Sequence, residues 1–203
     1  MFTGIIQTVV DVEQSEQKNS SLFLKIKKPI NLRIRPGDSI SLNGVCLTVV
    51  KVTPKSLNVE LMSETLAKTS FGKILQKKLN FEAPLNSFSE IGGHSVLGHV
   101  DTVGKILQTI DAGNSLLVKI GFPSKFFNLL VEKGSVAVNG VSLTVLAVGK
   151  NWLTLALTPY TLINTTFKDL KVGDWVNLEF DMIGKYVNKL FQANLDGYAK
   201  KKR

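Results

Sequence analysis

The sequence predicts an all-β protein: two tandem six-stranded antiparallel barrels that arose by internal duplication, followed by a C-terminal α-helix. Three observations lead to this fold class. Residues 41–52 return almost unchanged as 137–148, with Asn-Gly-Val, Cys or Ser, and Leu-Thr-Val in both copies. Residues 64–71 return at the same spacing as 160–167. Short segments rich in Val, Ile, Leu, Thr and Phe alternate with turn residues along the whole chain, which is typical of a repeated β domain.

The expected strands are short and evenly spaced, and no helical pattern separates them. They cover 4–12, 22–27, 39–42, 45–52 and 57–62 in the first copy, and 99–108, 115–120, 135–138, 141–148, 152–157 and 175–180 in the second. This arrangement favours antiparallel sheet, and closing each sheet into a barrel leaves no open edge. We therefore expect about six strands in each copy.

Two Asn-Gly pairs, Asn43-Gly44 and Asn139-Gly140, fit two-residue hairpin turns, because both central positions of such a turn require positive φ. Side chains alternate across a strand, so the strand after each turn has one apolar face and one face with small polar groups. One interpretation is ordinary alternation, with Cys46 a half-buried filler. The other is that the small polar groups line the mouth of a small-molecule pocket.

The linker between the copies, 84–93, is rich in turn-forming residues, and we place the domain boundary near residue 97. The expected units are therefore 1–97, 98–181 and 182–203. The first two are the barrels, and the third is a helix that ends in a basic tail.

A C-terminal helix is predicted after Asp181, which is placed to cap it. Its apolar residues form one stripe, made of Met182, Ile183, Tyr186, Val187, Leu190, Phe191 and Leu195. The stripe needs a partner: the helix either folds back on its own barrel or assembles subunits. A shorter helix is predicted over 123–133, because that segment starts with Pro and is followed by Gly.

Composition narrows the class of protein. The chain has 203 residues, is 44% hydrophobic and 20% charged, and has a net charge of +9. It contains neither a long apolar run nor a secretory leader, so we expect a cytoplasmic protein without membrane contact. The basic runs are not interleaved with aromatic residues, so we expect no nucleic-acid partner. One cysteine and two histidines make a poor ligand set, so we expect no metal.

Both histidines lie at the junction of the copies, in the segment 92–99. Glycine next to a histidine lets the backbone approach a ligand, and imidazole suits proton transfer near neutral pH. For His94, capping of a loop is the interpretation we favour. The chain has no nucleophile elbow, no glycine-rich phosphate loop and no dinucleotide motif.

The ordered set of motifs nevertheless resembles riboflavin synthase of the alpha chain type. The resemblance is carried by residues 1–5, the twin Asn-Gly-Val strands, 64–66, 92–100 and 181–187. It implies two Greek-key barrels and a C-terminal helix that holds a homotrimer. It also implies an active site between the N-terminal barrel of one subunit and the C-terminal barrel of another.

The activity implied by the resemblance is that of a transferase without a cofactor. Two molecules of 6,7-dimethyl-8-ribityllumazine would give riboflavin and 5-amino-6-ribitylaminouracil by transfer of a four-carbon unit. The alternative is a noncatalytic lumazine- or flavin-binding antenna protein of the same fold. Association with lumazine synthase, and which barrel holds the donor, stay open.

The resemblance also implies two substrate-binding pockets. The pocket assigned to the first barrel consists of Gly4, Ile5, Ile6, Ser39, Cys46, Thr48, Met62, Glu64 and Thr65. The pocket assigned to the second barrel consists of Gly98, His99, Val100, Lys133, Ser142, Thr144, Thr158, Thr161 and Asp181. His99 and Ser142 are expected to handle protons. Cys46 is a candidate nucleophile or polar contact, and Asp181 a candidate base or ribityl ligand.

Two positions depart from the pattern of this family. Asn139 stands where Asp is common, so a general-base role at that position is in doubt. Tyr160 stands where Glu commonly precedes the matching Thr of the second copy.

Overall fold

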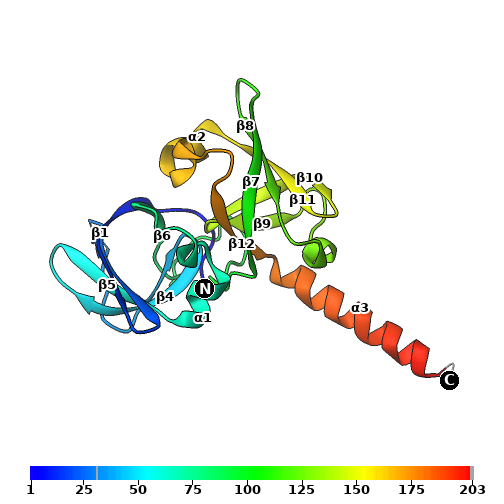
Figure 1. Cartoon of the computed structure of the whole chain (residues 1–203), viewed down its shortest axis with the longest axis horizontal. Coiled ribbons are helices and arrows are strands. Elements are labelled where there is room, and N and C mark those ends of the chain that lie inside the picture. Colours follow the sequence, from blue (N-terminus) through cyan, green and yellow to red (C-terminus); the bar gives the residue numbers. More distant parts are fainter. Residues whose placement is uncertain (31, 202–203) are drawn as a thin grey trace.

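The computed structural model describes residues 1–30 and 32–201, and it contains two closed antiparallel barrels side by side (Figure 1). The strands of the first barrel are β1 (Thr8–Lys18), β2 (Ser21–Lys27), β3 (Ser39–Leu42), β4 (Val45–Val52), β5 (Ser56–Leu61) and β6 (Lys78–Glu82). Around the barrel they follow the order β1-β2-β5-β4-β3-β6.

The second barrel repeats the first strand by strand. Its strands are β7 (Thr102–Asp111), β8 (Leu116–Gly121), β9 (Ser135–Val138), β10 (Val141–Gly149), β11 (Trp152–Leu157) and β12 (Trp175–Phe180). Started from β7, its order is β7-β8-β11-β10-β9-β12. Both barrels therefore have the same Greek-key topology, which confirms the predicted duplication.

Three strands differ from the sequence-based expectation. β6 was missed, because its five residues follow a lysine-rich stretch and only Leu79 and Phe81 face the barrel interior. β1 and β7 begin at Thr8 and Thr102, later than expected. The residues before these two strands leave their own barrel and contact the other one.

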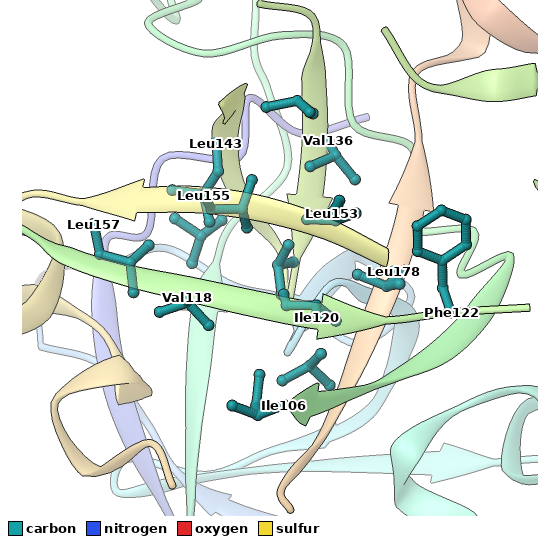
Figure 2. Packing of buried hydrophobic residues seen from close by; sticks show 14 of the residues in the cluster. Ile106, Val118, Ile120, Phe122, Val136, Leu143, Leu153, Leu155, Leu157 and Leu178 are labelled. Carbon is teal, nitrogen blue, oxygen red and sulfur yellow. The ribbon is translucent and has the colours of Figure 1, made fainter. Parts of the chain in front are cut away.

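Each barrel is filled by the inward faces of its strands. In the second barrel, Val118, Ile120, Leu153 and Leu155 converge on the axis (Figure 2) and are at most 1% exposed. Burying such a side chain contributes about 1.5–3 kcal/mol. The predicted alternation is confirmed: Val45, Leu47 and Val49 of β4 are buried, as are Val141, Leu143 and Val145 of β10.

Short helices connect the strands. They are α1 (Ser63–Lys68), the 3₁₀ helices η1 (Ser70–Gly72), η2 (Ser124–Leu129) and η3 (Thr166–Asp169), and α2 (Pro159–Asn164). The helix expected over 123–133 is present as η2 but is shorter. Within 1–30 and 32–201, no helix is both long and apolar enough to cross a membrane.

The C-terminal helix α3 (Met182–Lys201) extends away from the second barrel (Figure 1). Asp181 caps it as predicted, since its Oδ1 accepts a hydrogen bond from the Ile183 N–H at 2.9 Å. Gly184 lies against the backbone of η2, where an added Cβ would be 2.9 Å from the Leu129 carbonyl oxygen.

This packing leaves the predicted apolar stripe of α3 in solvent. Five of its residues are 60–71% exposed: Ile183, Tyr186, Val187, Leu190 and Phe191. The stripe therefore does not fold back on its own barrel. Leu195, also expected in the stripe, has a side chain outside the described ones.

The two barrels meet at their Asn-Gly turns, around a pseudo-two-fold axis. Both turns have the predicted positive φ values, 46° and 76° at Asn43 and Gly44 and 46° and 79° at Asn139 and Gly140. A Cβ added to Gly44 would lie 2.6 Å from the Gly140 nitrogen. The turns are thus part of the contact between the two barrels.

Four buried asparagines complete this contact. The Asn80 Nδ2 donates to the Asn139 carbonyl at 2.9 Å, and the Asn177 Nδ2 donates to the Asn43 carbonyl at 2.8 Å. Within each barrel, the Oδ1 of Asn43 or Asn139 accepts a backbone N–H at 2.8 Å. Asn139 is therefore used to join the two copies.

Candidate active site

The residues that precede β1 and β7 cross from one barrel to the other. We call residues 3–7 the first leader and residues 97–101 the second leader. The Gly4 carbonyl of the first leader accepts the Ser142 N–H at 2.8 Å, and the Gly98 carbonyl of the second accepts the Cys46 N–H at 2.9 Å. Each leader therefore covers the outer face of the other copy's barrel.

This crossing corrects the grouping made from the sequence. Gly4, Ile5 and Ile6 were assigned to the first barrel, but Gly4 contacts Ser142 and Ile6 packs against the core of the second barrel. Conversely, Gly98 contacts Cys46, and Val100 packs against the core of the first barrel. Repeats in a sequence identify equivalent residues but do not show which barrel each segment covers.

The first candidate pocket lies on the outer face of β3 and β4. Ser39 and Thr48 are cross-strand partners there, and Cys46 lies two residues from Thr48 on the same face. Cys46 is half-buried beneath Gly98, which has a φ of 77°. A Cβ at Gly98 would be 2.6 Å from the Cys46 Cβ, so only glycine fits.

His99 follows Gly98 on the second leader and is exposed. The leader thus brings His99 to the outer face that carries Cys46. The sequence analysis placed Cys46 and His99 in different pockets, whereas in the structure the leader that carries His99 covers Cys46.

Met62, Glu64 and Thr65 lie where β5, the neighbour of β4, ends and α1 begins. Met62 is exposed. The Lys68 ammonium donates to the Glu64 carboxylate at 2.6 Å and lowers its pKa. Among the described contacts, no hydrogen bond joins these three residues to Cys46.

The second candidate pocket lies on the outer face of β10, around Ser142 and Thr144. The His94 Nδ1 lies 2.7 Å from the Ser142 Oγ, and the His94 N–H donates to the Thr3 carbonyl at 3.1 Å. A side chain on Gly93 would overlap both Ser142 and Thr3. The interpretation of His94 as a loop cap was therefore wrong: its ring contacts a predicted site residue. The two glycines before it were the available signal.

Burial lowers the pKa of the His94 imidazole, and the nearby carboxylate of Asp181 offsets part of this shift. The ring is therefore neutral at pH 7. A neutral imidazole has one nitrogen that donates and one that accepts, so it can exchange a proton with Ser142. His94, Ser142 and Asp181 thus form one electrostatic group.

The remaining predicted residues lie on loops and helix ends of the second barrel. Thr158 caps α2, with its Oγ1 3.1 Å from the Thr161 Oγ1. Lys133 is exposed in the turn before β9, where its N–H donates to the Val145 carbonyl at 2.8 Å. Within the described part of the chain, no hydrogen bond connects these residues to Ser142.

Neither candidate pocket coincides with the cleft between the barrels. A cleft of about 560 Å³ between the barrels is lined by residues such as Lys73, Asn139 and Trp175, and none of the predicted site residues lines it. The candidate pockets thus lie outside this cleft, on the barrel faces that the leaders cover.

The two barrels, each with a polar face partly covered by a leader, define a tandem-barrel protein with two related candidate binding surfaces. The family model described as Lumazine binding domain matches twice, at residues 3–83 and 97–181. The match therefore falls separately on each barrel.

Similar proteins extend over nearly the whole chain. The riboflavin synthase of Photobacterium phosphoreum is 39% identical over 193 residues, covering 94% of this chain and 88% of that protein. The riboflavin synthase of Bacillus subtilis (strain 168) is 36% identical over 197 residues, covering 96% and 92%. This chain belongs to the riboflavin synthase family.

A solved structure of LumP complexed with riboflavin has the same fold. It superposes with a TM-score of 0.82 at 21% identity, covering 89% of this chain and 99% of that one. LumP complexed with 6,7-dimethyl-8-(1'-D-ribityl) lumazine gives a TM-score of 0.79 at 20% identity.

Proposed function

We propose that this protein is a riboflavin synthase that acts as a cofactor-independent transferase. Two molecules of 6,7-dimethyl-8-ribityllumazine react, and one transfers a four-carbon unit to the other. The products, riboflavin and 5-amino-6-ribitylaminouracil, together contain the same atoms as the two substrates. The reaction therefore needs no external oxidant or reductant.

The observation that carries the proposal is the presence of two candidate pockets with the same backbone arrangement but different side chains. A reaction between two copies of one molecule needs two binding sites of similar shape, one for the donor molecule and one for the acceptor. Holding both reactants in the reactive orientation can lower the activation free energy by up to about 7–11 kcal/mol in favourable cases. The near full-length similarity to riboflavin synthases supports the same activity.

In the second pocket, we assign proton handling to Ser142 with His94, because their side chains are within hydrogen-bond distance. Asp181 has one of two roles: its carboxylate acts as a base beside His94 and Ser142, or it binds the ribityl chain. In the first pocket, His99 is the proton-handling group and Cys46 a polar contact to the heterocycle. Hydroxyls on the barrel faces and on the adjoining helix ends are donors and acceptors for the ribityl chains. These are Ser39, Thr48 and Thr144 on the strands, and Thr65, Thr158 and Thr161 at α1 and α2.

We further propose a cytoplasmic homotrimer in which the first pocket of one subunit faces the second pocket of its neighbour. The exposed apolar stripe of α3 supports assembly, because about 60–70% exposure of five large apolar side chains on one helix face is unfavourable in water. The two pockets lie on different barrels of the chain. Two substrates can meet where barrels of neighbouring subunits adjoin. In this assembly, 182–203 is the trimerisation unit.

The test uses purified full-length protein, 6,7-dimethyl-8-ribityllumazine and a chelator, without any added cofactor. We expect riboflavin and 5-amino-6-ribitylaminouracil in equal amounts, measured by chromatography, and a trimeric mass by light scattering. Tight binding of the lumazine without turnover would instead identify the antenna-type protein. Turnover only after addition of a cofactor would contradict the cofactor-independent reaction.

A further inference from the structure

Two buried carboxylates hold the leaders, and neither is among the predicted site residues. Glu82 of β6 is 3% exposed and Glu179 of β12 is 4% exposed. Both lie on the outward face of their strand, two residues after the asparagines that join the barrels. Burial raises the pKa of each, and the N–H groups of the leaders lower it in part. Such groups are costly to bury unless their oxygens are well hydrogen-bonded.

Glu179 accepts three backbone N–H groups of the second leader. Its Oε1 accepts the Leu97 N–H at 2.7 Å, and its Oε2 accepts the N–H groups of Gly98 and His99 at 2.9 Å each. Two of the three bonded residues belong to the first pocket: Gly98, which covers Cys46, and His99 itself. Glu179 thus fixes the backbone of a candidate proton-handling residue.

Glu82 makes the equivalent contacts to the first leader. It accepts the Thr3 N–H at 2.7 Å, the Thr3 Oγ1 at 2.8 Å and the Gly4 N–H at 3.0 Å. The position equivalent to His99 on this leader is Ile5, which has no titratable group. The two carboxylates are therefore alike in geometry but differ in what they position.

A second contact holds the far end of the second leader and has no counterpart in the first copy. The Asp101 Oδ2 lies 2.7 Å from the Lys185 Nζ of α3 and also accepts the Phe180 N–H at 2.8 Å. The side chains of Asp101 and Lys185 are only 19% and 29% exposed. In the first copy, the corresponding Gln7 accepts the Ala83 N–H at 3.0 Å, and among the described residues its side chain forms no ion pair with a helix.

We propose that Glu179 and Lys185 are positioning residues for the reaction: Glu179 fixes His99 over the first pocket, and Lys185 ties this leader to α3. The inference rests on the proposed function. Because α3 presents the apolar stripe proposed to join subunits, Lys185 links subunit assembly to the placement of His99. Misplacing a reacting group by about 1 Å can cost roughly 100-fold in rate.

The test compares Glu179→Gln with Glu16→Gln, a change of an exposed glutamate far from both leaders. A glutamine presents an N–H to one of the three N–H groups, so we expect kcat to fall about 10- to 100-fold. KM for the lumazine should change less than about 3-fold, since the groups on the barrel faces remain. A rise in KM with unchanged kcat would overturn the proposal.

A double-mutant cycle with His99→Ala separates positioning from stability. If Glu179 acts through His99, Glu179→Gln should cost little in the His99→Ala background. Additive losses would overturn the proposal. Folding of each variant is checked by its melting temperature and its light-scattering mass.

Lys185→Met gives an independent arm if Glu179→Gln fails to fold. We expect kcat to fall about 3- to 10-fold with an unchanged trimeric mass, whereas Lys189→Met on the same helix should leave kcat unchanged. Equal effects of the two lysine variants would overturn the role of Lys185.

Failure of the proposed function is distinguishable from failure of this inference. An absence of riboflavin formation by the unmodified protein rejects the proposed function alone. The placement of His99 is then measured from its ring signals by NMR spectroscopy. Glu179→Gln should shift and broaden these signals while Glu16→Gln leaves them unchanged, and unshifted signals in Glu179→Gln would reject the positioning role.

Discussion

The two candidate pockets share one backbone frame but differ in their chemistry. In both, a glycine with a φ of 77° lies directly over a small polar residue, Gly98 over Cys46 and Gly4 over Ser142. In both, a buried glutamate holds the covering leader. The frame is therefore the part of the duplicated unit that both copies keep.

The side chains on this frame have diverged. The first pocket has a thiol and an exposed imidazole on its leader, whereas the second has a hydroxyl bonded to the half-buried imidazole of His94. The leader position equivalent to His99 is Ile5. A duplicated protein can thus bind the same molecule twice and still treat the two copies differently, which a dismutation requires.

The largest expected effect tests the part of the backbone that both copies share where the two Asn-Gly turns meet. Gly44→Ala and Gly140→Ala each place a Cβ 2.6–2.7 Å from a backbone nitrogen of the other turn. We expect each to destabilise the protein by about 3 kcal/mol or more, from positive φ plus overlap. Gly113→Ala is the control, since Gly113 has a φ of 78° but no atom within 4 Å of an added Cβ. Chemical denaturation measures all three, and equal losses for Gly44→Ala and Gly113→Ala would contradict the inter-barrel packing.

The second prediction tests the divergence of the pockets. We expect Ser142→Ala and His94→Ala to lower kcat by about 100-fold or more, with similar losses because the two side chains act as a pair. Cys46→Ser makes the first pocket resemble the second and should cost less than about 10-fold. Steady-state kinetics decide, and a loss larger for Cys46→Ser than for Ser142→Ala would favour a nucleophilic thiol.

The third prediction is a pH dependence that belongs to the second pocket. The folded protein keeps His94 neutral with a lowered pKa, while the unfolded chain binds a proton at the ordinary pKa of about 6.5. Stability from this group is therefore present above that pH and is lost as pH falls through the lowered value. The melting-temperature difference between the unmodified protein and His94→Gln should shrink on acidification below about pH 6.5.

The buried carboxylates act in the opposite direction. Their raised pKa values mean that the folded state holds protons longer, so their stabilising contribution is present at low pH and is lost as pH rises through those values. Comparing Glu82→Gln with His94→Gln therefore separates the two effects. A His94→Gln difference that is constant with pH would argue against a neutral, half-buried imidazole.

The smallest expected effect concerns the exposed edge of the first pocket. Glu64 and Lys68 form an exposed i,i+4 pair on α1, and such pairs contribute little to stability. Glu64→Gln should leave the melting temperature unchanged but weaken riboflavin binding at the first pocket, measured by fluorescence titration. Glu64→Tyr copies the second barrel at the position of Tyr160 and should weaken binding further. Unchanged affinity in both variants would remove Glu64 from the site.

Local features of the fold were readable from the sequence. The Asn-Gly turns were predicted because two consecutive positive φ values leave few other residue choices. The alternation around Cys46 and Ser142 follows from the two-residue period of a strand. The cap at Asp181 follows from the free N–H groups of a helix start. Each of these depends only on neighbours in the chain.

The sequence did not reveal β6 or its role. Leu79 and Phe81 give it only two inward residues, so its pattern is too short to separate from a loop. Its outward residues include Asn80 and Glu82, which carry no motif in the sequence. In the structure they are 1% and 3% exposed, and they join the barrels and hold the first leader.

The sequence by itself determined the duplication, the strand faces and the small polar residues on those faces, because these depend on local periodicity and on comparison of the copies. Only the tertiary structure decided that each leader crosses to the other barrel and that His94 lies against Ser142. Such contacts join residues far apart in the chain. They depend on how two finished barrels dock, and no short segment encodes that arrangement.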